Sequence, residues 1–249
     1  MAESFTHDAE ALVSLQRVVK NYQGLRPLRI QALTVKRGDA VALLGFDAAT
    51  AEVLVNLVTA GSLPDEGEVR IFGTATSAIR DHTSWMALID RFGLISHRSP
   101  LLASLTAEQN LALPFELAVE SLEDEVRQIV RRLADEIALP VAHLSQPVAA
   151  LPAASQLRVR LGRALALRPE VVLAEHPNAT LEAADAAALA ADLARIRQDR
   201  QLATVVMTAD KRFAEASGTD ILTLQAATGE LKPSSSWRRR WFGQSRPPT

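Results

Sequence analysis

Along the chain, the spacing of hydrophobic and polar positions predicts strands that alternate with helices, after an opening section richer in strands. Alternating positions from Leu12 to Val19 and from Leu28 to Val35 predict two strands, with a turn at Tyr22-Gln23-Gly24 between them. The apolar run from Val41 to Leu44 predicts a buried strand, and helical spacing follows it from Ala48 to Ala60. The chain therefore opens with strands and then changes to alternating elements.

The strongest helical signal lies between Leu122 and Leu139, where apolar residues recur at helical spacing. The other predicted elements are strands at residues 68–73, 91–96, 171–174 and 203–207, helices at residues 155–167 and 181–196, a helix start at Thr106, and a late hairpin at residues 220–224 and 230–232. This order predicts an α/β fold, with a mainly parallel sheet core, an N-terminal antiparallel β subdomain and a helical insertion over about residues 97–167.

Composition narrows the class of protein. Hydrophobic residues make up 48% of the 249, which is enough for a sizeable core, and the net charge of −2 argues against a nucleic-acid partner. The chain has no cysteine, which excludes disulfides, thiolate catalysis and zinc–thiolate sites. No apolar run approaches the roughly 18 residues of a membrane span, and the N-terminus does not resemble a signal peptide. We therefore expect a cytoplasmic protein.

The C-terminal residues depart from this composition. A basic and aromatic segment follows Pro233 and three serines: Trp237, Arg238, Arg239, Arg240, Trp241 and Phe242. Such a segment suits an anionic membrane surface or an acidic groove on a partner, and a disordered basic tail is the alternative. We expect one domain over residues 1–234 and a separate tail over residues 235–249.

The order of several segments resembles the ATP-binding subunit of ABC transporters, over roughly residues 12–232. The matching segments are Gly61 to Val69, Leu101 to Pro114, Arg158 with Gly162 to Pro169, and Val172 to Pro177. The resemblance implies a P-loop NTPase-like fold. Within the family, the Asn-Leu-Ala-Leu-Pro segment and the Leu-Ala before Glu175 look most like the lipoprotein-release, macrolide-export and Mla-type lipid-transport ATPases.

In this alignment, the P-loop of the family falls on the segment that begins at Gly45. A working loop reads Gly-x4-Gly-Lys-Ser/Thr, in which the lysine neutralises phosphate and the hydroxyl holds magnesium. Gly45 keeps the first glycine, but Thr50, Ala51 and Glu52 replace the last three residues. A carboxylate about 4 Å from a phosphate charge costs roughly 4 kcal/mol at an effective dielectric near 20. Tyr22 falls where the family stacks an aromatic side chain on adenine.

The other motifs of the family are altered as well. His97 stands at the Q-loop glutamine, Glu175 at the Walker B aspartate, His176 at the catalytic glutamate and Ala209 at the switch histidine. The signature motif falls on Leu151, Pro152, Ala153, Ala154 and Ser155, of which Ser155 is also expected to cap a helix. These replacements predict that ATP is not hydrolysed. We expect no cofactor, with ATP and magnesium bound only weakly if at all.

The resemblance implies a structural or regulatory subunit of a membrane ABC complex, with a lipid or lipoprotein as its cargo. Its expected partners are a membrane permease and a second ATPase-like subunit, either a copy of itself or a different chain, at the inner face of the cytoplasmic membrane. Leu101, Leu102, Leu105 and Phe115 fall where the family grips its permease. The alternative for these four residues is internal packing.

Two other functions stay open from the sequence. Glu52, His97, Glu175 and His176 would converge on one site, and two carboxylates with two imidazoles could hold a divalent transition metal, as a structural clamp or a metal hydrolase. The remaining alternative is a weakly active ATPase of unusual geometry.

Overall fold

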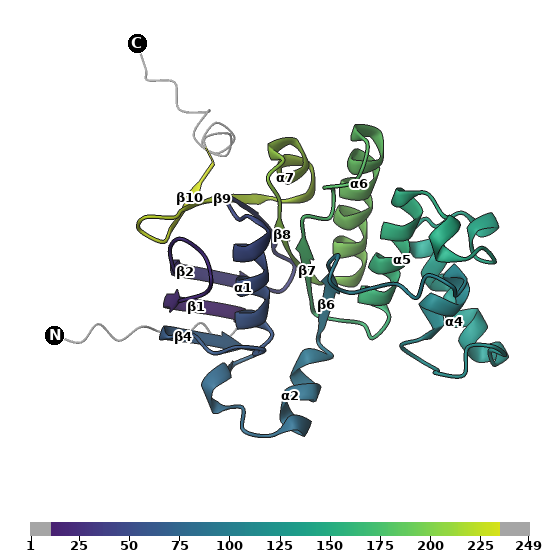
Figure 1. The fold of residues 1–249 in the computed structure, drawn as a ribbon, viewed down its shortest axis with the longest axis horizontal. Helices are drawn as coiled ribbons and strands as arrows, with labels where there is room; N and C mark the ends of the chain where they lie inside the picture. Colours follow the sequence, from purple (N-terminus) through teal and green to yellow (C-terminus); the bar gives the residue numbers. More distant parts are fainter. Residues whose placement is uncertain (1–10, 235–249) are drawn as a thin grey trace, which may run out of the picture.

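The computed structural model describes residues 11–234, which form two sheets with helices around them (Figure 1). The smaller sheet is antiparallel, with the strand order β2-β1-β4-β5. Its strands are β1 (Ala11–Lys20), β2 (Leu28–Lys36), β4 (Glu66–Ile71) and β5 (Thr74–Ala75). This sheet is the antiparallel subdomain that the opening alternation predicts.

The larger sheet has six strands in the order β10-β9-β3-β8-β7-β6, and every neighbouring pair except β10 and β9 is parallel. Its strands are β3 (Ala40–Leu44), β6 (Phe92–Ile95), β7 (Val171–Glu175), β8 (Ala203–Met207), β9 (Asp220–Gln225) and β10 (Glu230–Pro233). Helices cover both faces of such a sheet, so its central strands are apolar throughout rather than alternating. The mainly parallel α/β fold predicted from the sequence is confirmed.

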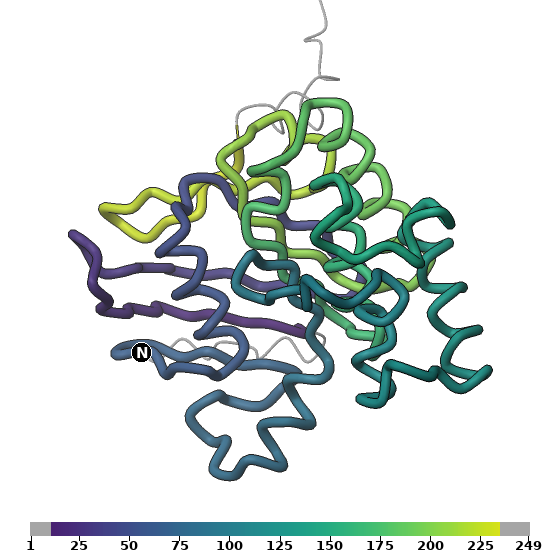
Figure 2. Tube along the Cα trace, turned by 45° about the vertical axis from the view of Figure 1, so that its right-hand side comes forward, coloured from purple at the N-terminus to yellow at the C-terminus, as the bar shows by residue number. Residues whose placement is uncertain are grey.

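The helices divide between the two sides of the larger sheet. They are α1 (Ala48–Val58), α2 (His82–Ile89), α3 (Ala107–Ala112), α4 (Asp124–Glu136), α5 (Ala153–Leu165), α6 (Ala183–Arg200) and α7 (Lys211–Ser217), with short 3₁₀ turns at Thr76–Ala78, Val141–His143 and Val148–Ala150. Figure 2 shows the segment that carries α3, α4 and α5 in teal, on the side of the molecule away from β1 and β2. Within residues 11–234, no helix is long and apolar enough to cross a membrane.

Alternate residues of β7 show how the core is divided. Val171 and Leu173 belong to the cluster that α1 and the antiparallel sheet complete, whereas Val172 and Ala174 belong to the cluster of α3 to α6. Successive side chains of a strand point to opposite faces, so one short apolar strand serves both clusters. The parallel sheet is therefore the layer between α1 on one side and the helical segment on the other.

Two helices were missed by the sequence analysis, α2 and α7. No residue of α2 is buried, so the helix lacks the apolar stripe that identifies a helix in a sequence. The short α7 begins after Asp210, whose side chain accepts hydrogen bonds from the backbone of Arg212 and Phe213. Periodicity cannot detect a helix of seven residues, although Asp210 is a preferred type of N-cap residue.

Candidate functional site

The carboxyl ends of β3, β7 and β8 meet at one edge of the parallel sheet, where ligands of open α/β folds bind. Gly45 follows β3 with φ of +84°, a backbone conformation that glycine adopts without steric cost. An added Cβ there would also lie 3.2 Å from the carbonyl oxygen of Leu224. The first glycine of the loop is thus required by the backbone itself.

The helix α1 begins at this edge, and Asp47 caps it. Its carboxylate accepts a hydrogen bond of 2.8 Å from the backbone N–H of Thr50 and one of 2.7 Å from the Thr50 hydroxyl. These bonds hold the pKa of Asp47 below its usual range. Ala51, which the sequence analysis aligns with the family's lysine, is fully buried, and its methyl group carries no charge. The start of α1 is therefore capped by a carboxylate from this chain.

Arg98 links the two acidic positions of the site, and the sequence analysis did not identify it. Its Nη1 lies 3.2 Å from Oε1 of Glu52, its Nε lies 3.2 Å from Oε2 of Glu175, and its Nη2 pairs with the other oxygen of Glu175. These hydrogen bonds to Glu175 are the main cause that raises the pKa of Arg98. The sequence analysis placed two carboxylates at this site. Carboxylates removed from water need a nearby cation, so a search for a basic residue close to these positions could have identified Arg98.

Glu175 ends β7 and is the buried carboxylate of this group, at 7% exposure. Ser96 donates a hydrogen bond of 2.6 Å to its Oε2, so both oxygens of Glu175 are satisfied by neighbouring side chains. His176 follows with φ of +44°, and its Nε2 is buried without a hydrogen-bond partner. A conformation of this kind is uncommon for residues other than glycine and occurs often at functional sites.

A cavity of about 450 Å³ lies beside the loop and contains Tyr22. Arg26, Arg29, Asp47 and Thr50 are among the other residues that line it. Burial and then the charge of Asp47 raise the pKa of the Tyr22 hydroxyl, so this tyrosine stays neutral at physiological pH. The cavity offers an aromatic ring and two cations next to the start of α1.

The remaining predicted positions are separated from this cluster or lie at its border. His97 is exposed and Ala209 is exposed after β8, whereas the neighbouring Arg98 reaches Glu52 and Glu175. The signature residues Leu151 to Ser155 form the start of α5, and Pro152 is its N-cap residue. The prediction that Ser155 caps this helix is wrong, because Ser155 is buried inside the first turn and bonds Nδ1 of His143 at 2.8 Å.

The predicted metal site is not formed. Among the described residues, no three His, Asp or Glu side chains gather closely enough to hold a metal ion, and this includes Glu52, His97, Glu175 and His176. The physical reason is Arg98, which occupies the space between the two carboxylates, while His97 is exposed.

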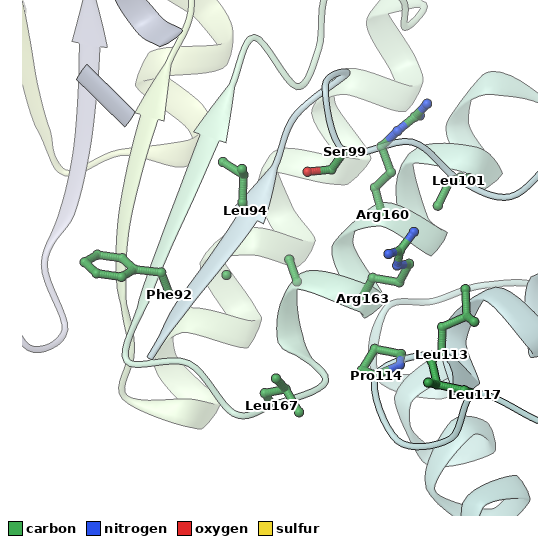
Figure 3. Close-up of a pocket in the computed structure, with 12 residues that line it drawn as sticks. Phe92, Leu94, Ser99, Leu101, Leu113, Pro114, Leu117, Arg160, Arg163 and Leu167 are labelled. Carbon is green, nitrogen blue, oxygen red and sulfur yellow. The ribbon is translucent and has the colours of Figure 1, made fainter. Parts of the chain in front are cut away.

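A groove of about 470 Å³ lies between β6 and the helical segment (Figure 3). Arg160 and Arg163 extend from α5, with Phe92 and Leu94 on one side and Leu101, Leu113 and Leu117 on the other. Of the four residues predicted to grip a permease, only Leu101 lines this groove. Leu102 is half-exposed outside it, Leu105 packs against the core, and Phe115 is partly buried. The predicted tail, Trp237 to Phe242, lies outside the described residues.

Comparison with known families gives one clear match. The family model described as "ABC transporter" matches residues 28–179, which is more than half of the chain. The lipoprotein-releasing system ATP-binding protein LolD of Alcanivorax borkumensis is 26% identical, over 84% of this chain and 92% of its own. The methionine import ATP-binding protein MetN of Bifidobacterium longum is 25% identical over 80% of this chain, but the match spans only 51% of MetN.

A solved structure supports the same assignment. The ATP-binding cassette MJ0796, determined as a dimer in a post-hydrolysis state bound to ADP and Pi, superposes with a TM-score of 0.74 at 25% identity. The match covers 88% of this chain and 96% of that cassette. These findings overturn the expectation that no cofactor is needed, because the family is one of ATP-binding cassettes and a similar cassette holds nucleotide products.

The residues present suit one part of a nucleotide with its magnesium ion, but not the other part. The cavity with Tyr22, Arg26 and Arg29 suits a nucleoside and the negative charge that accompanies it. The end of the site that would hold a metal does not fit magnesium as it stands, because Glu52 and Glu175 already pair with Arg98. The nucleotide end and the metal end of the site therefore have different chemistry.

Proposed function

The chain belongs to the ABC transporter family, and on that premise we propose that it is a cassette subunit that binds nucleotide without hydrolysing it. Its role is structural or regulatory within a membrane transport complex. The observation that carries the proposal is the pairing of Glu175 with Arg98 and Ser96. The Walker B carboxylate is thereby committed to internal bonds, and the next residue is His176 rather than a glutamate.

Two further positions support the loss of hydrolysis. Ala51 places a buried methyl group where the family uses a lysine, and the exposed Ala209 has no imidazole to take the place of the switch histidine. Removing one group that stabilises a transition state typically costs about 10²–10³ in rate, and several such losses at one site remove useful turnover. The scaffold around these positions is retained, which supports a role that depends on shape and nucleotide binding.

We propose a membrane permease and a second cassette as the partners, at the inner face of the cytoplasmic membrane. The dimeric form of MJ0796 and the transport systems named for the relatives support this assembly. The groove at Leu101, Leu117, Arg160 and Arg163 is the proposed contact for the permease, since it combines exposed apolar side chains with two cations.

A lipid or lipoprotein is the proposed cargo. The match to LolD covers nearly all of that relative, whereas the match to MetN covers about half of it. The Asn-Leu-Ala-Leu-Pro segment, which resembles the lipoprotein-release ATPases, and the match to LolD support this proposal. The division into a cassette over residues 1–234 and a basic aromatic tail over residues 235–249 also stays a proposal.

The test of this function measures release of phosphate from ATP by the purified chain, beside its His176→Ala variant. We expect both proteins to show the same background rate. Turnover by the wild type that is lost in His176→Ala would instead establish the weakly active ATPase. A second measurement is affinity purification from membranes: a permease with several spans should accompany the chain, and its absence would contradict the proposed complex.

A further inference from the structure

Arg98 joins the two positions that hold magnesium in P-loop NTPases. In such proteins the metal is held by a hydroxyl of the P-loop and by the Walker B aspartate. In this chain those positions are Glu52 and Glu175, and the guanidinium of Arg98 bonds both. A cation of the protein itself therefore lies between the same two elements, α1 and β7.

The two replacements suit a guanidinium better than a metal ion. Both side chains are glutamates, longer than the serine or threonine and the aspartate of the family pattern, and both extend far enough from α1 and β7 to bond the guanidinium. Magnesium requires about six oxygens in near-octahedral geometry and gives up its water reluctantly. Arginine is permanently charged, and its planar fork bonds carboxylates with two N–H groups at once.

The surroundings hold Arg98 in this position. Its backbone N–H donates a hydrogen bond of 3.0 Å to Oγ of Ser96, and that same hydroxyl donates to Glu175. Glu175 is almost entirely buried, and a buried carboxylate is costly without a cation. A magnesium ion from solution would have to displace an arginine that the chain keeps permanently next to both carboxylates.

The guanidinium also retains capacity for a ligand. Three of its N–H groups bond the two glutamates, which leaves two of the five N–H donors of arginine unused. The side chain is 39% exposed, so the guanidinium group is not enclosed by its two carboxylate partners. We propose that Arg98 replaces the divalent metal in this cassette, and that nucleotide phosphate is bound without magnesium.

This inference rests on the proposed function, because it assumes that the chain retains nucleotide. The first experiment titrates the purified chain with a fluorescent, non-hydrolysable ATP analogue, once with magnesium and once with EDTA. The two affinities should agree within about twofold. A loss of tenfold or more in EDTA, or no binding in either solution, would overturn the proposal.

Arg98→Ala is the decisive variant, and Arg37→Ala is its control. Arg37 pairs with Glu170 at the opposite end of the sheet, so its removal should change neither affinity nor metal dependence. Arg98→Ala should bind the analogue at least tenfold more weakly in EDTA, with partial recovery when magnesium is added. Equal binding by Arg98→Ala and the wild type in EDTA would count against the proposal.

A measurement with metal alone does not depend on nucleotide. Mn²⁺, followed by electron paramagnetic resonance, should not bind the wild type at this site, but should bind Arg98→Ala, in which the two carboxylates are released. The double variant Arg98→Ala/Glu52→Gln should lose that binding. Stoichiometric Mn²⁺ on the wild type that Glu52→Gln abolishes would refute the replacement, whereas the phosphate-release and membrane experiments decide the proposed function separately.

Discussion

Asp47 connects the local structure of the loop with the chemistry of the site. As the N-cap residue of α1, it satisfies a backbone N–H group that has no partner within the helix. Its negative charge also meets the positive end of the helix dipole. The N-terminus of α1 therefore already interacts with a carboxylate of this chain. The family binds phosphate at the same end of this helix.

Replacing Asp47 tests this interpretation at the scale of one residue. Asp47→Ala should lower the free energy of unfolding by about 1 kcal/mol at neutral pH, and Asp47→Asn by clearly less, because asparagine caps helices about as well. Urea unfolding followed by circular dichroism measures both. Equal losses for the two variants would show that the charge of Asp47, and not its cap hydrogen bond, stabilises the helix.

The pH dependence of this contribution has a defined sign. The pKa of Asp47 in the folded protein lies below its ordinary value of 3.8, mainly because of the hydrogen bond from Thr50. The charged cap therefore stabilises the protein above pH 3.8, and its contribution is lost as the pH falls through the lower, folded pKa. The advantage of the wild type over Asp47→Ala should shrink in that acidic range and stay constant above it.

Among the secondary-structure elements, β6 and α5 pack more closely than ordinary side chains allow. A Cβ added at Gly93 would lie 2.4 Å from the carbonyl oxygen of Ala164, which belongs to the backbone of α5. The contact brings the strand before Arg98 against the helix that carries Arg160 and Arg163. The positions of both the site and the groove thus depend on this pair of elements.

Gly93→Ala should therefore destabilise the protein by about 1–3 kcal/mol, the usual cost of inserting a methyl group into a closely packed interface. Gly61→Ala is the matched control, since its added Cβ would meet only ordinary contacts of 3.5 Å or more. Thermal unfolding of the two variants compares them directly. A Gly93→Ala protein as stable as Gly61→Ala would mean that the helix can move away without cost.

At the scale of the whole molecule, the groove and the candidate site around Arg98 lie at the two ends of one short segment. Arg98 follows β6 at the site, and the next residues of the same segment, Ser99 and Leu101, line the groove. Arg163 bonds the carbonyl of Pro100 at 2.8 Å, which ties this segment to α5. A partner seated in the groove therefore contacts the segment that carries Arg98.

The contribution of the groove to complex formation can be tested with exposed apolar residues. Leu117 lines the groove and is 86% exposed, whereas Val141 is 73% exposed and lies outside it. Leu117→Asp should weaken capture of the permease about tenfold or more, as loss of an apolar anchor does at interfaces, and Val141→Asp should leave capture unchanged. Equal effects of the two variants would place the permease elsewhere.

The sequence predicted most of the fold for two reasons. Regular spacing of apolar residues over a long segment identifies a helix or a strand, and the order of helices and strands limits the possible topologies. The helix at residues 122–139 and the buried strands after residues 40, 170 and 202 were confirmed within a few residues. The helix α2 was not predicted because none of its residues is buried, and α7 was not predicted because it is too short to show a period. The start of α5 was placed two residues late, since Pro152 and not Ser155 precedes its first turn.

The sequence alone determined the family and the fold, because these depend on the order and spacing of segments along the chain. Only the tertiary structure decided how the replaced positions are joined. The sequence pointed to His97 as the functional side chain after β6, but the neighbouring Arg98 reaches Glu52 and Glu175. His97 and Arg98 lie in the turn that follows β6, where the path of the backbone decides which side chain faces the site, and this path cannot be read from residue spacing.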